Sequence, residues 1–252
     1  MKSASPGVLL EIPHPHRPKV IMHNGIGAPS TIHGRPRENT LALRAVIFDF
    51  GMVLTGQPDQ DAHAAMIRIT GLPVARFEEL YWADRHAYDE GRLTGVMFWQ
   101  NFVRDAKLSL QPEQIDELNR QDVRMWSTQN PRMLAWQLQL KQHGLRTAIL
   151  SNMGDSVLEN LERKFDWLPR FDVLIWSFQH RMAKPDPAIY KLTLTRLGTK
   201  AEETLFIDDK QVNIDAAAKL GMPGILFSTI EQLRSQLIST GLDKQLPLPT
   251  PS

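Results

Sequence analysis

Hydrophobic and polar positions alternate along this chain in two rhythms. Short apolar runs, of the kind that form buried strands, lie at residues 43–48, 145–150, 172–177, 204–207 and 224–227. Between the later runs, apolar residues recur every three to four positions, which is typical of amphipathic helices. Strands that alternate with helices in this way predict an α/β fold with a parallel sheet covered on both faces.

The helices of this α/β part carry ordinary start and stop signals. Asn130-Pro131 supplies an N-cap and a first helical residue, and Gly144 follows the last turn of the same helix. The other helices are expected at residues 155–164, 187–197, 213–220 and 230–238. These signals make the alternation regular from residue 130 to residue 240.

From about residue 58 to residue 129 the pattern is helical throughout. A short helix is expected at residues 61–69 and a longer one at 74–90, while Thr94 and Pro112 stand where two more helices begin. No strand interrupts this block in the pattern. The predicted division is an α/β core of residues 41–56 and 130–240, with a helical domain of residues 57–129 inserted after the first strand.

The two ends of the chain look different from the rest. Residues 1–40 contain prolines at positions 6, 13, 15, 18, 29 and 36, which disfavour helices and central strands. Four histidines lie in the same segment without regular helical spacing: His14, His16, His23 and His33. We expect a flexible N-terminal extension rather than a metal site, and a loose, proline-rich tail at residues 241–252.

Composition narrows the classes of function. The chain has 252 residues, 42% of them hydrophobic, and a formal net charge of +1. This charge gives no strong field for nucleic acid or acidic membranes. The chain has no cysteine, which excludes disulfides, thiolate catalysis and cysteine-ligated zinc. The apolar segment at residues 7–12 is too short for a signal-peptide core. We expect a soluble cytoplasmic protein, with neither nucleic acid nor a membrane as partner.

Polar side chains gather where the predicted strands end. Asp49 and Gly51 follow the first strand, Ser151-Asn152 follows the second, and Asp208-Asp209 follows the fourth. Lys184-Pro185 stands in the loop before the helix at 187–197. Taken singly, each of these is typical of a turn, a helix cap or a solvated loop. The carboxyl ends of parallel strands share one edge, however, so these groups are expected to converge.

The converging groups suit phosphoryl transfer. Asp49, Asp208 and Asp209 would repel one another unless a cation joined them, and a few hard oxygen ligands suit Mg²⁺. Lys184 would neutralise a phosphoryl group, and the Ser151 hydroxyl and the Asn152 amide would donate to its oxygens. Asp49 then remains as the nucleophile that forms an aspartyl phosphate.

These motifs resemble the haloacid dehalogenase (HAD) superfamily, in its branch with a helical cap inserted after the first motif. The similarity lies in FDFGMVLT at residues 48–55, Ser151, MAKPDPAIY at 182–190 and FIDDKQVNIDAA at 206–217. The resemblance covers residues 43–240. It implies a Rossmann-like core with a mobile cap, and Asp49 as both nucleophile and Mg²⁺ ligand. It further implies the Gly51 carbonyl as a ligand, with Asp209 as the direct ligand of the acidic pair and Asp208 as its neighbour.

One departure from the family pattern concerns the leaving group. Phosphatases of this superfamily commonly carry a second aspartate two residues after the nucleophile, as general acid and base, whereas this chain has Gly51. Losing a general acid costs roughly 10²–10⁴ in rate. Some similar proteins with glycine here, which resemble sugar-phosphate phosphatases, are thought to be active, which implies that a cap residue or a substrate-bound water supplies the proton. Asp84, His86 and Asp89 are candidates because they are titratable and lie in the cap.

Three functions remain open on the sequence. The leading one is a Mg²⁺-dependent phosphatase that acts on a small phosphorylated metabolite, such as a sugar phosphate. The second is a haloacid dehalogenase, which Gly51 permits but the intact Asp208-Asp209 pair disfavours. The third is a binding protein without turnover, with a surface built from cap aromatic residues: Tyr81, Trp82, Phe98, Trp99 and Phe102. The sequence leaves the substrate and the oligomeric state open.

Overall fold

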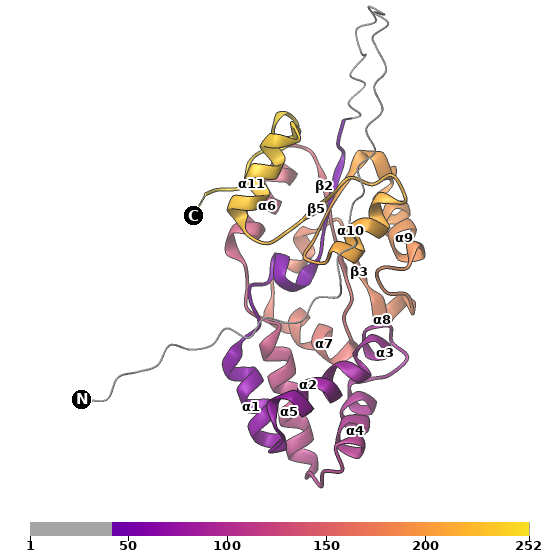
Figure 1. The fold of residues 1–252 in the computed structure, drawn as a ribbon. Coiled ribbons are helices and arrows are strands. Elements are labelled where there is room, and N and C mark those ends of the chain that lie inside the picture. The colour runs from indigo at the N-terminus through magenta and orange to yellow at the C-terminus, as the bar shows by residue number, and fades with distance from the viewer. Residues whose placement is uncertain (1–41, 252) are drawn as a thin grey trace, which may run out of the picture. The chain divides into compact units, whose positions relative to one another are not determined.

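The computed structural model describes residues 42–251, and these contain one parallel sheet of five strands (Figure 1). The strands are β1 (Ala45–Phe48), β2 (Arg146–Ser151), β3 (Val173–Trp176), β4 (Thr204–Asp208) and β5 (Gly224–Leu226). Their order is β3-β2-β1-β4-β5, so β1 is central and pairs with both β2 and β4. The strand order reverses between β1 and β4, where doubly wound sheets bind their ligands.

Helices cover both faces of the sheet, because the side chains of β1 alternate between two apolar clusters. Val46 and Phe48 pack with one cluster, and Ala45 and Ile47 pack with the other. The first face is covered by α6 (Pro131–Gln142), α7 (Asp155–Lys164) and α11 (Ile230–Ser239), and the second by α9 (Pro187–Leu197) and α10 (Gln211–Ala218). The predicted α/β fold with a Rossmann-like parallel sheet is confirmed.

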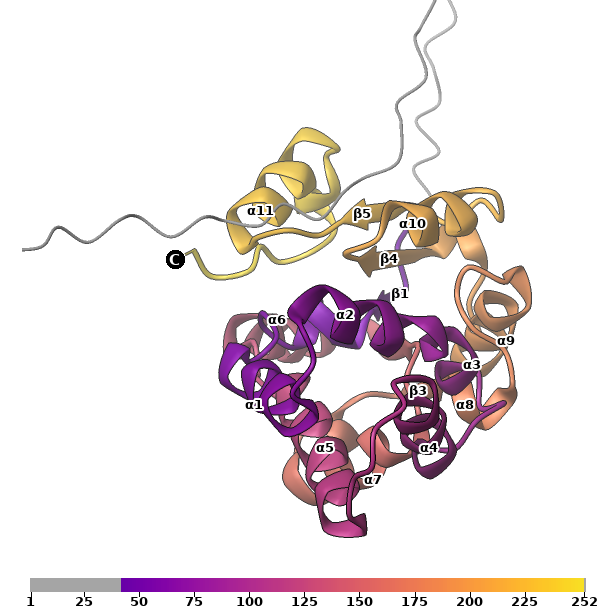
Figure 2. The ribbon, with the colours of Figure 1, turned by 60° about the horizontal axis from the view of Figure 1, so that its bottom comes forward.

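A helical cap is inserted between β1 and α6. It consists of α1 (Gln60–Thr70), α2 (Val74–Ala83), α3 (Arg85–Asp89), α4 (Gly95–Asp105) and α5 (Pro112–Met125). These helices lie together in Figure 1, and they stand in front of the strands when the molecule is viewed from the cap (Figure 2). The cap has an apolar cluster of its own, which includes Phe77, Leu118 and several buried aromatic residues. The inserted helical cap that we predicted is therefore present.

The cap departs from expectation at residues 74–90, where we predicted one helix. The helix breaks at Asp84, whose backbone leaves the helical region at φ −102° and ψ 2°. The Asp84 carboxylate accepts a hydrogen bond from Asn101 Nδ2 at 2.8 Å. Beyond the break, α3 buries Arg85 and Tyr88. Burial of a charged residue with partners on another helix therefore overrides the helical periodicity of the segment.

The cap aromatic residues form an interior and not a binding surface. Phe98, Trp99 and Phe102 are 1–3% exposed, and Tyr81 is 2% exposed. The interpretation of these four as a docking surface is therefore wrong, since their rings pack against one another in the cap core. Trp82 differs, because half of it is exposed.

The C-terminal segment is also ordered against the core, so the expected loose tail is wrong for the described residues 241–251. Leu246 is buried in the larger apolar cluster. Pro247 accepts a hydrogen bond from Trp136 Nε1 at 2.6 Å, and the Gln245 side chain accepts one from the Leu43 amide at 2.8 Å. Proline lacks a donor but keeps its carbonyl, so an extended proline-rich segment can still be anchored by donors of the core.

Residues 1–40, with the predicted flexible extension and its four histidines, lie outside the described residues. Within the part of the chain that the structure describes, no helix combines the length and the apolar character needed to cross a membrane.

Candidate active site

A tight turn after β1 presents Asp49 at the edge of the sheet. Its carboxylate Oδ1 accepts a hydrogen bond from the Phe50 amide at 2.7 Å. Met52 adopts the left-handed region at φ 61°, which is uncommon for a residue other than glycine. Thr55 Oγ1 stabilises this turn, because it accepts from the Met52 amide at 3.1 Å and donates to the Phe50 carbonyl at 3.3 Å. The turn thus holds Asp49 in one position.

Lys184 stands between two of the predicted acids. Its Nζ lies 2.8 Å from Asp49 Oδ1 and 2.6 Å from Asp208 Oδ2. Burial disfavours the charge on Lys184, but Asp208 and Asp49 outweigh burial and raise its pKa. The lysine is therefore a permanent cation at the centre of the cluster.

Asn152 holds Lys184 in place. The Asn152 Nδ2 group donates to the Lys184 carbonyl at 2.8 Å, and the Lys184 amide donates to Asn152 Oδ1 at 2.8 Å. Both ends of the amide are thus engaged by the backbone of the lysine. This positioning role was not anticipated, and the direct contact of Asn152 with substrate stays a prediction.

Asp208 is fully buried and surrounded by donors. Its carboxylate accepts from Lys184 Nζ, from the Lys210 amide at 2.8 Å, and from Asn213 Nδ2 at 2.9 and 3.0 Å. A carboxylate that is already held in this way positions its neighbours rather than offering free oxygens. Sequence reasoning missed Asn213, although an amide five residues after Asp208, in the first turn of α10, could have suggested it.

Three carboxylates meet at this edge. One carboxylate oxygen from each of Asp49, Asp208 and Asp209 lies within 4.8 Å of the other two. Burial raises the pKa of Asp49 to about 7, against the pull of Lys184 and with the repulsion of Asp208 and Asp209. Burial and the Asp208 charge likewise raise the pKa of Asp209. Lys184, and Lys210 acting on Asp209, do not balance three carboxylates, and a divalent cation would neutralise the remaining negative charge.

The donor set fits Mg²⁺, because it consists of hard carboxylate oxygens. Since Asp208 is saturated by protein donors, Asp49 and Asp209 are the residues that would hold the ion. Among the described residues, the polar contacts of Asp49 are made by Oδ1, so Oδ2 remains available. Gly51 lines the same cavity, and its carbonyl as a ligand stays a prediction.

A cavity of about 190 Å³ opens above these groups, between the core and the cap. On the core side it is lined by Asp49, Gly51, Ser151, Asn152, Lys184 and Asp209, so the structure brings together the predicted site residues apart from the buried Asp208. Ser151 is itself buried at the end of β2, and among the described residues its hydroxyl makes only a long contact of 3.5 Å to the Asn152 carbonyl. The hydroxyl is therefore loosely held beside the cavity.

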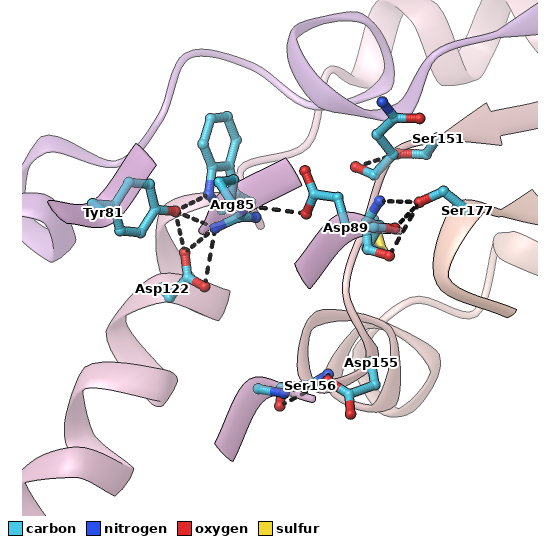
Figure 3. A network of polar contacts seen from close by, with 12 residues as sticks. Tyr81, Arg85, Asp89, Asp122, Ser151, Asp155, Ser156 and Ser177 are labelled. Atoms are coloured by element: carbon cyan, nitrogen blue, oxygen red, sulfur yellow. Dashed lines mark hydrogen bonds and ion pairs between the residues drawn. The ribbon is translucent and has the colours of Figure 1, made fainter. Parts of the chain in front are cut away.

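The cap closes the cavity with a second buried network, which the sequence did not reveal (Figure 3). Arg85 Nε lies 3.0 Å from Asp89 Oδ1, and Arg85 Nη1 lies 3.2 and 3.3 Å from the two oxygens of Asp122. Tyr81 donates to Asp122 at 2.6 Å and also contacts Arg85. The arginine appeared in the sequence as an ordinary helix residue, because its partner Asp122 is 37 positions away.

The three cap residues considered as proton donors differ in their position relative to the cavity. Asp89 lines the cavity. Asp84 is occupied by Asn101. The His86 side chain is 62% exposed and lies 3.7 Å from Glu90. Asp89 is therefore the candidate that the structure brings to the site.

The cap is joined to the core next to Asp89. Ser177, on α8 (Ser177–His180), donates to the backbone carbonyl of Asp89 and accepts from the Met153 amide at 2.8 Å. Gly91 approaches so closely that an added Cβ would lie 2.4 Å from the Phe178 carbonyl, and a Cβ on Gly154 would overlap the Tyr88 ring at 2.1 Å. Glycine is therefore required where the cap meets the core.

Comparison with known proteins agrees with this arrangement. A family model for haloacid dehalogenase-like hydrolases matches residues 43–221. Mouse acyl-CoA dehydrogenase family member 10 is 31% identical over 197 residues, which is 72% of this chain but 17% of the relative. Phosphatase MT3486 of Mycobacterium tuberculosis is 25% identical over 206 residues, which is 79% of this chain and 93% of that protein.

The solved structures show the same fold. A HAD family enzyme of Bacteroides thetaiotaomicron, in complex with magnesium and inorganic phosphate, superposes with a TM-score of 0.63 at 20% identity, over 74% of this chain and 94% of that one. The family model covers well over half of this chain and contains all four motifs. The chain therefore belongs to the family of haloacid dehalogenase-like hydrolases.

Proposed function

We propose that the protein is a Mg²⁺-dependent phosphatase that acts on a small phosphomonoester, such as a sugar phosphate. The observation that carries this proposal is the meeting of Asp49, Asp208 and Asp209 around Lys184, beneath an enclosed cavity. A phosphoryl group needs positive charge on its oxygens and a nucleophile in line with the leaving group. In this cluster Lys184 supplies the positive charge and Asp49 is the nucleophile.

The residues divide the work as follows. Asp49 attacks phosphorus with one carboxylate oxygen and forms an aspartyl phosphate, which water then hydrolyses. Lys184 and the Ser151 hydroxyl bind the phosphoryl oxygens, and Asp208 holds Lys184 in position. When bound by Asp49 and Asp209, Mg²⁺ would neutralise charge on the transferred group.

The relatives support this proposal. The Mycobacterium protein is named a phosphatase, and the Bacteroides enzyme was crystallised with magnesium and inorganic phosphate. The cavity also suits a small organic group, since Trp82 and Trp126 stand on its cap side and its volume is about 190 Å³. A sugar or a similar metabolite of a few carbons fits this description.

The test is phosphate release from a panel of phosphomonoesters, with Mg²⁺ and with EDTA. The wild type should turn over at least one ester in Mg²⁺ and none in EDTA. Asp49→Asn removes the nucleophile and should lower kcat by about 10⁴ or more. Asp243→Asn, on an exposed aspartate, is the matched control and should change nothing.

Three results would contradict the proposal. Full activity in Asp49→Asn would show that Asp49 is not the nucleophile. Hydrolysis of a 2-haloacid that survives EDTA would favour dehalogenation, in which Asp49 attacks carbon. Tight binding of Mg²⁺ and phosphate without turnover on the whole panel would indicate a binding protein.

A further inference from the structure

The active site has room for an acid at residue 51 but has none there. Gly51 lines the cavity, and an added Cβ would meet no atom of residues 42–251 within 4 Å. Its backbone, at φ −62°, is open to any residue. Sterics therefore do not explain the glycine. A leaving alkoxide nevertheless needs a proton, and its loss without one would cost roughly 10²–10⁴ in rate.

Asp89 is an acid on the opposite wall of the same cavity. It lines the cavity together with Asp49, Ser151 and Lys184, and in Figure 3 its side chain lies between Arg85 and Ser151, with the carboxylate turned toward Arg85. Its backbone carbonyl is held by the Ser177 hydroxyl of the core. The cap therefore delivers this carboxyl to the side of the cavity where the leaving group of a bound phosphoester would lie.

The surroundings of Asp89 raise the pKa of its carboxyl above the usual value. Burial raises the pKa of its carboxyl, and the Asp122 charge adds to the rise, whereas Arg85 and Lys210 act in the opposite direction. Arg85 shares its charge between Asp89 and a second carboxylate, because its guanidinium also contacts both oxygens of Asp122 and the Tyr81 hydroxyl. A shared cation orients the Asp89 carboxyl without compelling it to ionise.

We infer that Asp89 is the catalytic acid and base that replaces the missing side chain at Gly51, an inference that rests on the proposed phosphatase function. In the first step Asp49 forms a bond to phosphorus, the bond from phosphorus to the ester oxygen breaks, and Asp89 gives its proton to that oxygen. In the second step the Asp89 carboxylate takes a proton from water, which attacks phosphorus and breaks the bond to Asp49. Inorganic phosphate leaves, and both aspartates return to their starting states.

The experiment compares two esters in Asp89→Asn, which keeps the size of the side chain and an acceptor for Arg85. In 4-nitrophenyl phosphate the leaving group is a stable anion that needs no proton, whereas an alkyl phosphate needs one. First-turnover release of 4-nitrophenol should stay within about threefold of wild type, while cleavage of the best alkyl phosphate should fall about 10²–10⁴-fold. Asp116→Asn, on an exposed aspartate of the cap that does not line this cavity, is the matched control and should treat both esters as the wild type does.

A loss of equal size for both esters, or no loss for either, would overturn the role of Asp89. Such a result with an active wild type and a dead Asp49→Asn leaves the phosphatase proposal intact. A wild type that cleaves neither ester would overturn both.

A second variant does not depend on the folding of Asp89→Asn. Gly51→Asp places an acid where the cavity is open. If Asp89 already donates the proton, the added acid should raise alkyl ester cleavage by less than about threefold. A gain of about 10²-fold or more would mean that the wild type lacks an acid, and would overturn the inference.

Discussion

Two buried ionic clusters face one another across the cavity, and they are built differently. The core cluster surrounds one ammonium, Lys184, with the carboxylates of Asp49, Asp208 and Asp209. The cap cluster surrounds one guanidinium, Arg85, with two carboxylates and a phenol. Each has one cation, but the core has the larger excess of negative charge.

The difference follows from how each cation is used. Lysine is a point charge, and Lys184 binds one oxygen from each of two carboxylates, so charge remains for a metal to neutralise. Arginine has five donors in a fork, and Arg85 contacts Tyr81, Asp89 and Asp122 together. A proton on Asp89 leaves the cap cluster balanced by itself. The core side is thus suited to take a cation, and the cap side to hold a proton.

Removing the core cation should have the largest effect. In Lys184→Met two buried carboxylates, Asp49 and Asp208, lose their partner, which should lower the free energy of unfolding by about 3–5 kcal/mol and activity by about 10³. Because Mg²⁺ can take over part of the charge compensation, it should recover part of the stability. The measurement is urea unfolding with EDTA and with Mg²⁺.

Lys191→Met, at an exposed position of α9, is the control for this substitution and should change the stability by less than about 0.5 kcal/mol. If Mg²⁺ stabilises Lys184→Met no more than it stabilises the wild type, then the core cluster is not the site that binds the ion.

Removing the cap cation in Arg85→Met should lower stability by a similar amount, but Mg²⁺ should not restore it. Arg85→Met leaves Asp122 fully buried without its cation, so the unfolding free energy should fall by about 3–5 kcal/mol. Since the cap carboxylates are separate from the metal cluster, Mg²⁺ should restore none of this loss. If Mg²⁺ restores the stability of Arg85→Met as much as that of Lys184→Met, then the two clusters do not differ in metal binding.

The two clusters also differ in how far the sequence predicts them. Asp49, Ser151, Lys184 and Asp208 follow strands or precede a helix with clear start signals, and parallel pairing brings such positions to one edge. The fold and the core side of the site were therefore accessible from the residues alone. Asn213 was the exception, because an amide near a helix start resembles a cap.

The cap side was not accessible in the same way. Its network depends on the break at Asp84, which turns α3 so that Arg85 meets Asp122 on α5. Helical periodicity carries no information on such a break, and it left Asp89 equivalent to its titratable neighbours. The buried C-terminal segment around Leu246 was missed for a related reason, since proline content predicts the absence of helix but not the absence of contacts.

Replacing Gly154, where the cap meets the core, should destabilise the protein less than replacing Lys184 or Arg85, but by a measurable amount. Gly154→Ala would place a methyl group inside the Tyr88 ring, so the cap must move away from the core. Overpacking of this kind costs about 1–3 kcal/mol. The displacement should also slow alkyl ester cleavage, because it withdraws Asp89 from the cavity.

Gly56→Ala is the control for this change, since in the described part of the chain its Cβ would meet only the Thr128 methyl group, at an ordinary 3.5 Å. Thermal unfolding and alkyl ester turnover of the two variants measure the difference. Equal behaviour would mean that the contact between Tyr88 and Gly154 does not hold the cap.

The smallest expected effect comes from the proton on Asp49 in the metal-free protein. The pKa of this group rises from 3.8 to about 7 on folding, so between these values the folded state binds more protons than the unfolded state. Stability should therefore fall as pH rises, by at most about 1.4 kcal/mol between pH 6 and pH 7 from this group. Urea unfolding in EDTA, wild type against Asp49→Asn, isolates the contribution. Since Mg²⁺ competes with this proton, the fall should shrink in Mg²⁺, whereas a proton on Asp89 would not respond to the ion. If the stability of Asp49→Asn depends on pH in the same way as that of the wild type, then the group that titrates is not Asp49.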